Sequence, residues 1–356
     1  MCLPAGNRPH HDRAVIVLVT GASGFLGRAV AAELIAAGHE VRTLQRRPSR
    51  LHGATDILGS ITDLRQVARA IDSAESVIHL AAKVSLAGNA REFHTVNVEG
   101  TRTVLAAAEA AGVSRLVHVS SPSVAHAGSA LAGVGAEPAS PEQARGEYAR
   151  TKAKAELLAL ASDSVAMSVI AIRPHLVWGP GDTQLVDRIV DRARRGRLPL
   201  LNGGTALIDT TYIDNAASGI VAALHRADVA HGRAYVLTNG EPRPVGDILA
   251  SICLAAGVRP PQWSIPAGLG RTVGSVVERV WAARPGLDEP PMTRFLAEQL
   301  STAHWFDQRD IRQALAWSPT VTLDEGLRRL KASYSPRLIR GESTSATLRK
   351  DPEICR

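Results

Sequence analysis

The stretch Ala14-Val-Ile-Val-Leu-Val-Thr-Gly-Ala-Ser-Gly-Phe-Leu-Gly27 decides the fold of this 356-residue chain. Residues 14–19 are a short, continuous apolar run rich in β-branched side chains, which is typical of a strand buried in a parallel sheet. In the loop that follows, Gly21 permits a tight turn and Gly24 lets a pyrophosphate approach the backbone. Gly27 allows a helix to pack closely. The loop residues expected to contact a dinucleotide are Gly21, Ser23, Gly24, Phe25, Leu26 and Gly27.

A helix is predicted over 28–37, with Gly38 as its C-terminal stop. Its first amides and the positive end of its dipole would face the phosphates. A second strand is predicted over 40–44. Strand, glycine triplet, helix and strand in this order predict an α/β fold, a Rossmann-type doubly wound parallel sheet.

The residues after this second strand bear on the choice of cofactor. Folds that use NAD place an acidic residue here for the ribose 2′-hydroxyl, whereas this chain has Gln45-Arg46-Arg47. Guanidinium groups bind phosphate in bidentate fashion, so Arg46 and Arg47 favour NADP(H). NAD(H) stays possible if the two arginines are ordinary solvated loop charges.

The length suits a Rossmann core with a smaller C-terminal α/β lobe that binds substrate. We expect the NADP(H)-binding core over 13–172, with later segments returning to it, and most of the substrate lobe over 173–332. The polar residues 1–12 and 333–356 are predicted to be flexible tails.

Composition excludes several function classes. The net charge of +7 comes from 36 Arg and five Lys scattered along the chain, which argues against a nucleic-acid partner. Cys2, Cys253 and Cys355 offer neither a disulfide framework nor metal-ligand spacing, so no metal is expected and a reducing cytoplasm fits. No apolar run approaches the roughly 18 residues of a membrane-spanning helix.

Tyr148 and Lys152 suggest the chemistry. Four residues apart on a helix, they share one face, so the Lys152 ammonium can favour the ionised form of the Tyr148 phenol. The phenol would then be a proton donor nearer to working pH. Taken alone, the pair also fits two surface residues of an Ala- and Glu-rich helix.

Two further apolar runs end at the predicted ligand-binding edge of the sheet. The run 76–82 ends in small residues and is followed by Lys83, and the run 114–120 is followed by Ser121. A serine hydroxyl at this edge can polarise a carbonyl group, although serines also end strands as helix caps.

In these motifs the chain resembles the extended short-chain dehydrogenase/reductases. The matching motifs, spread over residues 14–330, are Thr20-Gly-x-x-Gly-x-x-Gly27, His79-Leu-Ala-Ala82, Asn97-Val-x-Gly-Thr101, Ser121 and Tyr148-x-x-x-Lys152. The resemblance implies a catalytic set of Ser121, Tyr148, Lys152 and Asn97. In it, Ser121 and Tyr148 bind a substrate carbonyl, Tyr148 passes the proton, and Lys152 holds the nicotinamide ribose and lowers the tyrosine pKa. It also implies cofactor contacts at Ser60, Ile61, Leu80, Ala81, Ala82, Lys83, Tyr148, Lys152, Pro174 and Val177.

One departure weakens the match. The family usually has an acidic residue before the aliphatic residue beside adenine, where this chain has Ser60 before Ile61.

Within that family the segments 172–182 and 208–217 look like the branch of 3β-hydroxysteroid and sterol 4α-carboxylate dehydrogenases. The segments 289–296 and 304–307 are more similar to the 2-alkyl-3-oxoalkanoate reductases of bacterial olefin synthesis, which reduce a β-keto acid with NADPH. The resemblance therefore implies reduction of a long-chain 2-alkyl-3-oxoalkanoate, with a steroid dehydrogenase as the alternative. A sugar-nucleotide epimerase or dehydratase is a second alternative, and a non-catalytic dinucleotide sensor or scaffold is a rival of another class.

Several C-terminal residues keep two interpretations. His175 is expected to touch substrate, and Arg173 forms either a buried ion pair or a carboxylate contact. We expect Asp209 and Tyr212 to be pocket residues or hydrogen-bond partners between domains. Tyr212 is also predicted to contact the substrate. Asp214 is expected to cap a helix.

Residues 263–284 carry an amphipathic stripe at helical spacing, formed by Leu269, Val273, Val276, Val277, Val280 and Trp281. We expect this stripe to pack on the substrate lobe. The alternatives are a contact with a homodimer partner or a pathway enzyme, or with a membrane surface that presents an apolar substrate.

Overall fold

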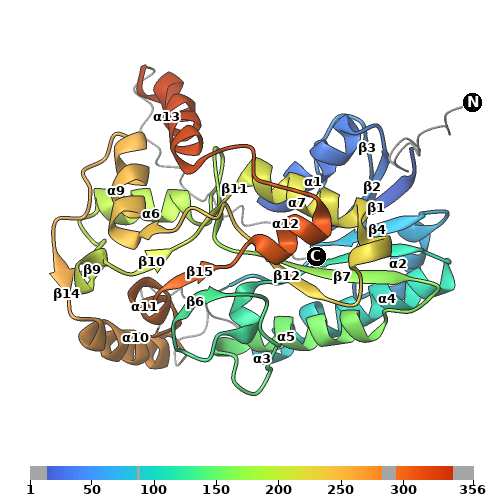
Figure 1. Ribbon diagram of the computed structural model, residues 1–356, viewed down its shortest axis with the longest axis horizontal. Coiled ribbons are helices and arrows are strands. Elements are labelled where there is room, and N and C mark those ends of the chain that lie inside the picture. The colour runs from blue at the N-terminus through green and yellow to red at the C-terminus, as the bar shows by residue number, and fades with distance from the viewer. Residues whose placement is uncertain (1–13, 86–88, 283–293, 340–356) are drawn as a thin grey trace, which may run out of the picture.

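The computed structural model describes residues 14–85, 89–282 and 294–339. A seven-stranded sheet forms the dinucleotide half, which lies on the right in Figure 1, and a smaller lobe lies on the left. All neighbouring strands of the large sheet are parallel. Their spatial order is β12 (Ala234–Leu237), β7 (Ser168–Pro174), β5 (Arg115–Val119), β4 (Ser76–His79), β1 (Ile16–Thr20), β2 (Glu40–Gln45) and β3 (Ala54–Leu58). The doubly wound α/β fold is thus confirmed.

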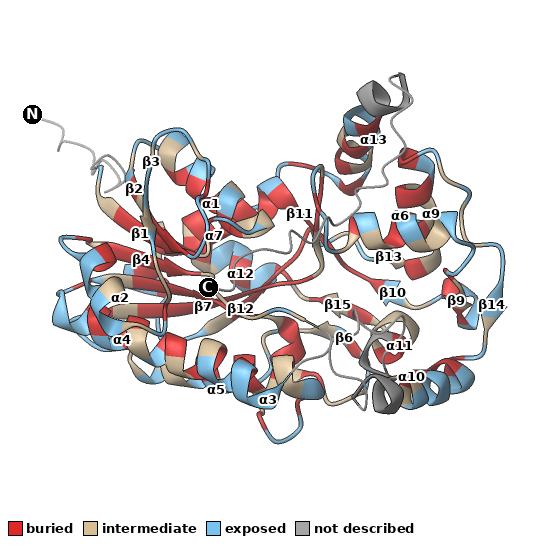
Figure 2. Cartoon of the chain, turned by 180° about the vertical axis from the view of Figure 1, so that it is seen from behind, coloured by how far each residue is buried: buried red, intermediate tan, exposed pale blue. Residues whose placement is uncertain are grey.

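Side chains of β1 alternate between two apolar cores, one on each face of the sheet. Val17 and Val19 belong to one core and Leu18 to the other, and all three are fully buried. The first face is covered by α1 (Phe25–Ala36), α7 (Ile213–His225), α8 (Ala227–Ala230) and α12 (Arg309–Leu315). The second is covered by α2 (Leu64–Ile71), α4 (Gly100–Ala110) and α5 (Gly146–Ala161). Covering both faces explains why the strands read as continuous apolar runs, and Figure 2 shows the buried residues along them.

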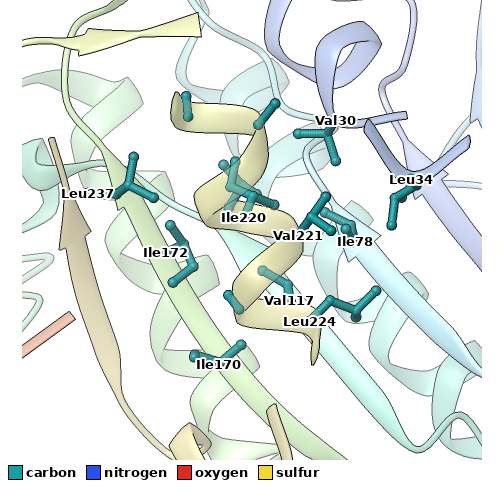
Figure 3. Packing of buried hydrophobic residues seen from close by; sticks show 14 of the residues in the cluster. Val30, Leu34, Ile78, Val117, Ile170, Ile172, Ile220, Val221, Leu224 and Leu237 are labelled. Atoms are coloured by element: carbon teal, nitrogen blue, oxygen red, sulfur yellow. The ribbon is translucent and has the colours of Figure 1, made fainter. Parts of the chain in front are cut away.

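Helix α7 belongs to the C-terminal half of the chain but packs on this sheet. In Figure 3, Ile220, Val221 and Leu224 of α7 point toward Val117 of β5 and Ile170 of β7. Strand β12 follows in the chain and pairs with β7. The chain therefore returns to the dinucleotide half after crossing into the lobe.

The lobe is built from short strands and a separate apolar core. Its four-stranded sheet has the order β13 (Arg243–Pro244), β10 (Leu207–Ile208), β15 (His304–Phe306) and β6 (Leu131–Val134). Two strand pairs, β8 (Val177–Trp178) with β11 (Thr211–Tyr212) and β9 (Leu200–Leu201) with β14 (Ser264–Ile265), complete the strands, and η3 (Asn202–Gly204) follows β9. Its helices are α6 (Val186–Arg194), α9 (Val245–Ala255), α10 (Ala267–Ala282), α11 (Arg294–Ser301) and α13 (Leu323–Ile339).

Element boundaries differ from the predicted ones at three places. Helix α1 begins at Phe25 rather than at residue 28, because Gly24 already serves as its N-cap. Strand β4 ends at His79, so the residues up to 82 form the loop beyond the sheet edge. Helix α13 runs to Ile339, because Tyr334 is buried in the lobe core; residues 333–339 are therefore no tail. The predicted tails over 1–12 and 340–356 lie outside the described residues.

Two side-chain interpretations are settled by their partners. Arg173 forms a buried ion pair with Glu156, which excludes the carboxylate-binding alternative for that side chain. Asp214 is not a helix cap, because α7 begins one residue earlier with Tyr212 as its N-cap. The Asp214 carboxylate instead pairs with Arg329 at 3.0 Å.

Three residues of the stripe on α10 do not pack on the lobe as expected, whereas Val277 is partly buried and the side chains of Val280 and Trp281 lie outside the described ones. Leu269, Val273 and Val276 are 53%, 43% and 52% exposed. The buried face of the helix carries Gly270 and Gly274 instead, and a Cβ on Gly270 would lie 2.9 Å from the Leu201 side chain. Glycines allow this close approach, and Leu269, Val273 and Val276 face outward. Contact of 263–284 with a second copy, a pathway enzyme or a membrane surface stays a prediction.

No helix within the described ranges is both long and apolar enough to span a membrane.

Candidate active site

The glycine loop has the shape that a dinucleotide pyrophosphate needs. Gly21 has φ +81°, and a Cβ there would lie 2.9 Å from the backbone of Ala81. A Cβ on Gly27 would lie 2.4 Å from the Gly21 carbonyl oxygen. No side chain caps the first amides of α1, which follow Gly24. The loop between Gly21 and Gly27, with the exposed Ser23 at its tip, therefore leaves backbone donors for phosphate at a helix N-terminus.

Arg46 and Arg47 follow the end of β2 and are both exposed. The structure also brings a carboxylate near them, Asp56 of β3, which the linear sequence gave no reason to place there. Its oxygens accept hydrogen bonds from the Thr43 hydroxyl at 2.5 Å and the Ser49 amide at 2.9 Å. Burial alone would raise the pKa of Asp56, but these bonds outweigh it and lower the pKa. Asp56 thus ties β2 and the loop after it to β3 through these hydrogen bonds.

Ser60 and Ile61 follow β3, as the adenine-side assignment requires. Ile61 is buried, and the Ser60 amide donates to Gln66 Oε1 at 2.7 Å. The acidic residue of this region is Asp63, whose carboxylate caps α2.

Leu80, Ala81, Ala82 and Lys83 pass the carboxyl end of β1, beside the glycine loop. The Ala81 amide donates to the Thr20 hydroxyl at 3.1 Å. The Lys83 amide donates to Asn97 Oδ1 at 2.7 Å, whereas its ammonium pairs with the exposed Glu92. Lys83 therefore offers its backbone, not its charge, to this edge.

Asn97 lies in η1 (His94–Glu99), a π-helical segment between α3 (Ala90–Phe93) and α4. Its amide nitrogen donates to the Lys83 carbonyl oxygen at 3.2 Å and to the Thr151 hydroxyl at 3.0 Å. Asn97 thus ties the loop after β4 to α5, the helix of the Tyr148–Lys152 motif.

Ser121 and Tyr148 meet at the carboxyl edge of the sheet. Ser121 directly precedes η2 (Pro122–Ala125), where its Oγ accepts a hydrogen bond from the Ser123 hydroxyl at 3.0 Å. Tyr148 lies in the first turn of α5 and hydrogen-bonds with Ser121. The two hydroxyls can hold one carbonyl oxygen between them.

Lys152 lies one turn further along α5 and is buried. Its Nζ donates to the Val119 carbonyl oxygen at 2.6 Å and lies 3.4 Å from His118 Nε2. Burial lowers its pKa to about 8, against an opposing effect of Glu156.

The expected lowering of the Tyr148 pKa by Lys152 is not found. Burial raises the pKa of Tyr148 to about 12, although the hydrogen bond with Ser121 opposes this rise. The ammonium of Lys152 bonds to the Val119 carbonyl oxygen and lies beside His118, so its hydrogen bonds go to β5 and not to the phenol.

A cavity of about 320 Å³ opens from Ser121 and Tyr148 into the lobe. Its apolar wall is formed mainly by Leu198, Ile208, Val245, Ile248, Leu249 and Ile252. Basic side chains also line it, namely His126, His175, His304, Arg188 and Arg192. The described lining residues include no Asp or Glu. The space suits a largely apolar ligand that carries a negative charge.

The structure separates the two predicted substrate residues. His175 lines the cavity, directly after Pro174 at the end of β7. Tyr212 does not line the cavity, so its prediction as a substrate contact was wrong. Its ring packs edge-on against Trp178 in the lobe core. Val177 is partly buried where the two apolar cores meet.

The sequence left two roles open for Asp209, whereas Arg188, Arg192, His126 and His304 were not predicted to be site residues. Asp209 supports the lobe rather than the cavity, since its carboxylate accepts hydrogen bonds from Thr238 and two backbone amides. Arg188 and Arg192 are one turn apart on α6, a spacing that was visible in the sequence. His126 and His304 are 178 residues apart, and no local pattern links them.

Comparison with known proteins assigns the family. Residues 17–238 match the NAD dependent epimerase/dehydratase family. A 2-alkyl-3-oxoalkanoate reductase of Stenotrophomonas maltophilia is 40% identical over 325 residues, covering 89% of this chain and 98% of the relative. A 3 beta-hydroxysteroid dehydrogenase/Delta 5-->4-isomerase of Mycobacterium tuberculosis is 32% identical over 355 residues, covering 94% and 95%. Among solved structures, MoeE5 in complex with UDP-glucose and NAD aligns with a TM-score of 0.69 at 25% identity, covering 90% of this chain and 99% of that one.

The glycine loop, the parallel sheet and these matches agree. The chain belongs to the NAD dependent epimerase/dehydratase family, within the extended short-chain dehydrogenase/reductases, and is an NAD(P)-dependent oxidoreductase.

Proposed function

We propose that this oxidoreductase reduces the 3-oxo group of a long-chain 2-alkyl-3-oxoalkanoate to the 3-hydroxy acid, with NADPH as the hydride donor. The observation that carries the proposal is the make-up of the cavity, which joins an apolar wall to basic side chains and has no carboxylate among its described lining residues. A β-keto acid with long alkyl chains matches both properties. Two relatives named as 2-alkyl-3-oxoalkanoate reductases, at 40% and 36% identity, support the same substrate class.

In the proposed reaction the protein positions the ketone and supplies the proton. The glycine loop would hold the cofactor pyrophosphate, and the bound cofactor would supply the hydride. Ser121 and Tyr148 hold the carbonyl oxygen, and Tyr148 gives its hydroxyl proton to the oxygen as negative charge develops there. The Lys152 ammonium lies one helical turn away, and Asn97 fixes the loop that faces α5.

A 3β-hydroxysteroid dehydrogenase is the second candidate, because a relative of that name matches nearly the whole chain. That relative is 32% identical to this chain, whereas a 2-alkyl-3-oxoalkanoate reductase is 40% identical, so we rank the steroid second. The sugar-nucleotide alternative needs polar groups for a nucleotide diphosphate, whereas the cavity wall is mainly apolar.

The test compares NADPH and NADH with the purified protein and a 2-alkyl-3-oxo fatty acid, and in parallel with a 3-oxosteroid. Turnover of the keto acid with NADPH is expected. Turnover of the steroid alone, or with NADH alone, would count against the proposal.

Arg46 and Arg47 allow the cofactor preference to be tested separately. Replacing both with Ser should raise KM for NADPH by about tenfold or more and change KM for NADH little, because charge-assisted bonds to a 2′-phosphate are lost. The matched control is Arg69→Ser, an exposed arginine on α2. Equal effects on the two cofactors would show that the arginines do not read the 2′-phosphate.

A further inference from the structure

His175 is a buried histidine with one ring nitrogen fixed by the protein. Its Nδ1 lies 2.5 Å from the Asp209 backbone oxygen. A carbonyl oxygen only accepts hydrogen bonds, so Nδ1 carries the hydrogen in the neutral ring and Nε2 carries a lone pair. Burial lowers the pKa of His175 to about 4, although the bond to Asp209 opposes the shift. The cavity therefore meets a neutral imidazole whose remaining nitrogen is free to accept a proton.

The sheet register places His175 beside the catalytic hydroxyls. Val119 of β5 pairs with Ile172 of β7, and the Ser120 amide donates to the Ile172 oxygen at 2.7 Å. Ser121 lies two residues beyond Val119 and His175 three residues beyond Ile172, and both line the cavity together with Tyr148. In a β-keto acid the carboxyl carbon is only two bonds from the carbonyl carbon. The group that binds the carboxylate must therefore adjoin the hydroxyls that hold the ketone.

The arginines of the cavity occupy a different position. Arg188 and Arg192 lie on α6, which packs on α9 within the lobe core. His175 follows β7 at the sheet edge that carries Ser121, whereas the arginines belong to the wall formed by the lobe.

Other ionisable groups act on His175 through two histidine neighbours. The His304 ring centre is 6.1 Å from that of His175, and His304 Nε2 lies 3.3 Å from His126 Nδ1. The buried Glu298 on α11 favours a proton on His126, whereas Arg145, the residue before α5, opposes it. The apolar ring of Phe306 also lies edge-on to His175, with 5.2 Å between the ring centres.

We propose that His175 binds the carboxylate of the substrate through Nε2 and takes up one proton when it does so. The inference rests on the proposed function. The proton comes from solvent and bonds to Nε2, and the resulting imidazolium donates it in a hydrogen bond to a carboxylate oxygen. When the acid leaves, the ring returns the proton to solvent. The two charges stabilise each other in a cavity with apolar walls, where an isolated charge is costly.

The experiment uses the oxidation direction, in which the substrates are stable. A 2-alkyl-3-hydroxy acid is compared with a secondary alcohol that is identical except that a methyl group replaces the carboxyl group. The rate of NADPH formation gives kcat/KM for both compounds at each pH. Ionisation of Tyr148 and Lys152 affects both compounds alike, so it drops out when kcat/KM for the acid is divided by kcat/KM for the alcohol. The ratio should fall about tenfold per pH unit between roughly pH 5.5 and 7.5, because one proton is taken up with the acid only.

The variant His175→Asn keeps a hydrogen-bond donor but cannot take up a proton. In this variant the ratio of kcat/KM for the acid to kcat/KM for the alcohol should be independent of pH. At pH 6 it should be roughly 10- to 100-fold lower than in the unchanged protein, which corresponds to the loss of one charge-assisted hydrogen bond. His175→Gln is made as a second replacement, and thermal unfolding shows which variants are folded.

Arg188→Gln is the matched control from the rival basic site. It should keep the pH slope, and loss of the slope in this variant but not in His175→Asn would overturn the assignment to His175. A flat ratio in the unchanged protein, with the acid still oxidised, would overturn this inference and leave the proposed function standing. If neither the acid nor the alcohol is oxidised, both the inference and the proposed function are overturned.

Discussion

The side chains of Arg173 and Glu156 form a doubly hydrogen-bonded ion pair beneath the active site. Arg173 Nε lies 2.8 Å from Glu156 Oε2 and Nη2 lies 2.5 Å from Oε1, with the two side chains 2% and 1% exposed. Arg173 also donates to the Glu137 carbonyl oxygen at 2.7 Å. The pair joins β7 to α5, the helix of Tyr148 and Lys152. Its position makes it a fixed support for the catalytic helix.

Replacing Glu156 with Gln should destabilise the protein by about 3–5 kcal/mol, because the Arg173 guanidinium remains buried without a counter-charge. Urea unfolding followed by circular dichroism measures the change. The control is Asp191→Asn, which breaks the exposed pair with Arg195 and should cost at most about 1 kcal/mol. Equal small effects of both replacements would contradict the supporting role of the pair.

Replacing Tyr148 with Phe should lower kcat by about 10²- to 10⁴-fold, the range for loss of a positioned general acid. NADPH binding, followed by fluorescence titration, should change little because the glycine loop is untouched. Tyr235→Phe is the matched control, since that hydroxyl bonds to the Ala230 oxygen outside the cavity. Full activity of the Tyr148 variant would revive the non-catalytic sensor hypothesis.

Gly27 offers a test of the loop geometry. Gly27→Ala would gain helix propensity, yet its Cβ would lie 2.4 Å from the Gly21 oxygen, so the backbone of the loop must shift. We expect NADPH affinity to fall by about tenfold or more, because the phosphate donors move with the loop. In the control Gly268→Ala, on α10, the added Cβ meets nothing within 4 Å. Unchanged NADPH affinity in Gly27→Ala would mean that the loop tolerates the methyl group.

The fold was predictable because its signals are local. The apolar run of β1 and the glycines from Gly21 to Gly27 are contiguous, and the Tyr148–Lys152 spacing is set by one helical turn. The helix boundary was missed because Gly24 caps α1 with its backbone, where no capping side chain marks the start.

The cavity was not predictable, since distant segments create it. His126 meets His304 only because β6, which begins five residues after His126, pairs with β15. Likewise, the spacing of Tyr148 and Lys152 did not predict that the Lys152 ammonium donates a hydrogen bond to the Val119 carbonyl oxygen. Residue pairing along the sheet, rather than helical spacing, decides where that charge lies.

Lys152 should impose an alkaline limit on the reductase. Its pKa of about 8 means that the ammonium is lost above that pH, so kcat/KM for reduction should fall as pH rises through about 8. Because the carboxylate of Glu156 raises this pKa, Glu156→Gln should move the limit to lower pH. Lys152→Arg should remove the limit, since arginine stays protonated, although its lower activity will reflect the changed shape.

Lys152 should also leave a signature in stability. Burial lowers the pKa of Lys152 from its ordinary value of 10.5 to about 8 in the folded protein. Between pH 8 and 10.5 the unfolded chain therefore binds more protons than the folded one. The lysine therefore contributes a free energy of unfolding that increases with pH across this window. Urea unfolding of Lys152→Met and of the unchanged protein at several pH values isolates this contribution. A difference between them that does not change from pH 8 to 10 would show that the ammonium is not destabilised by burial.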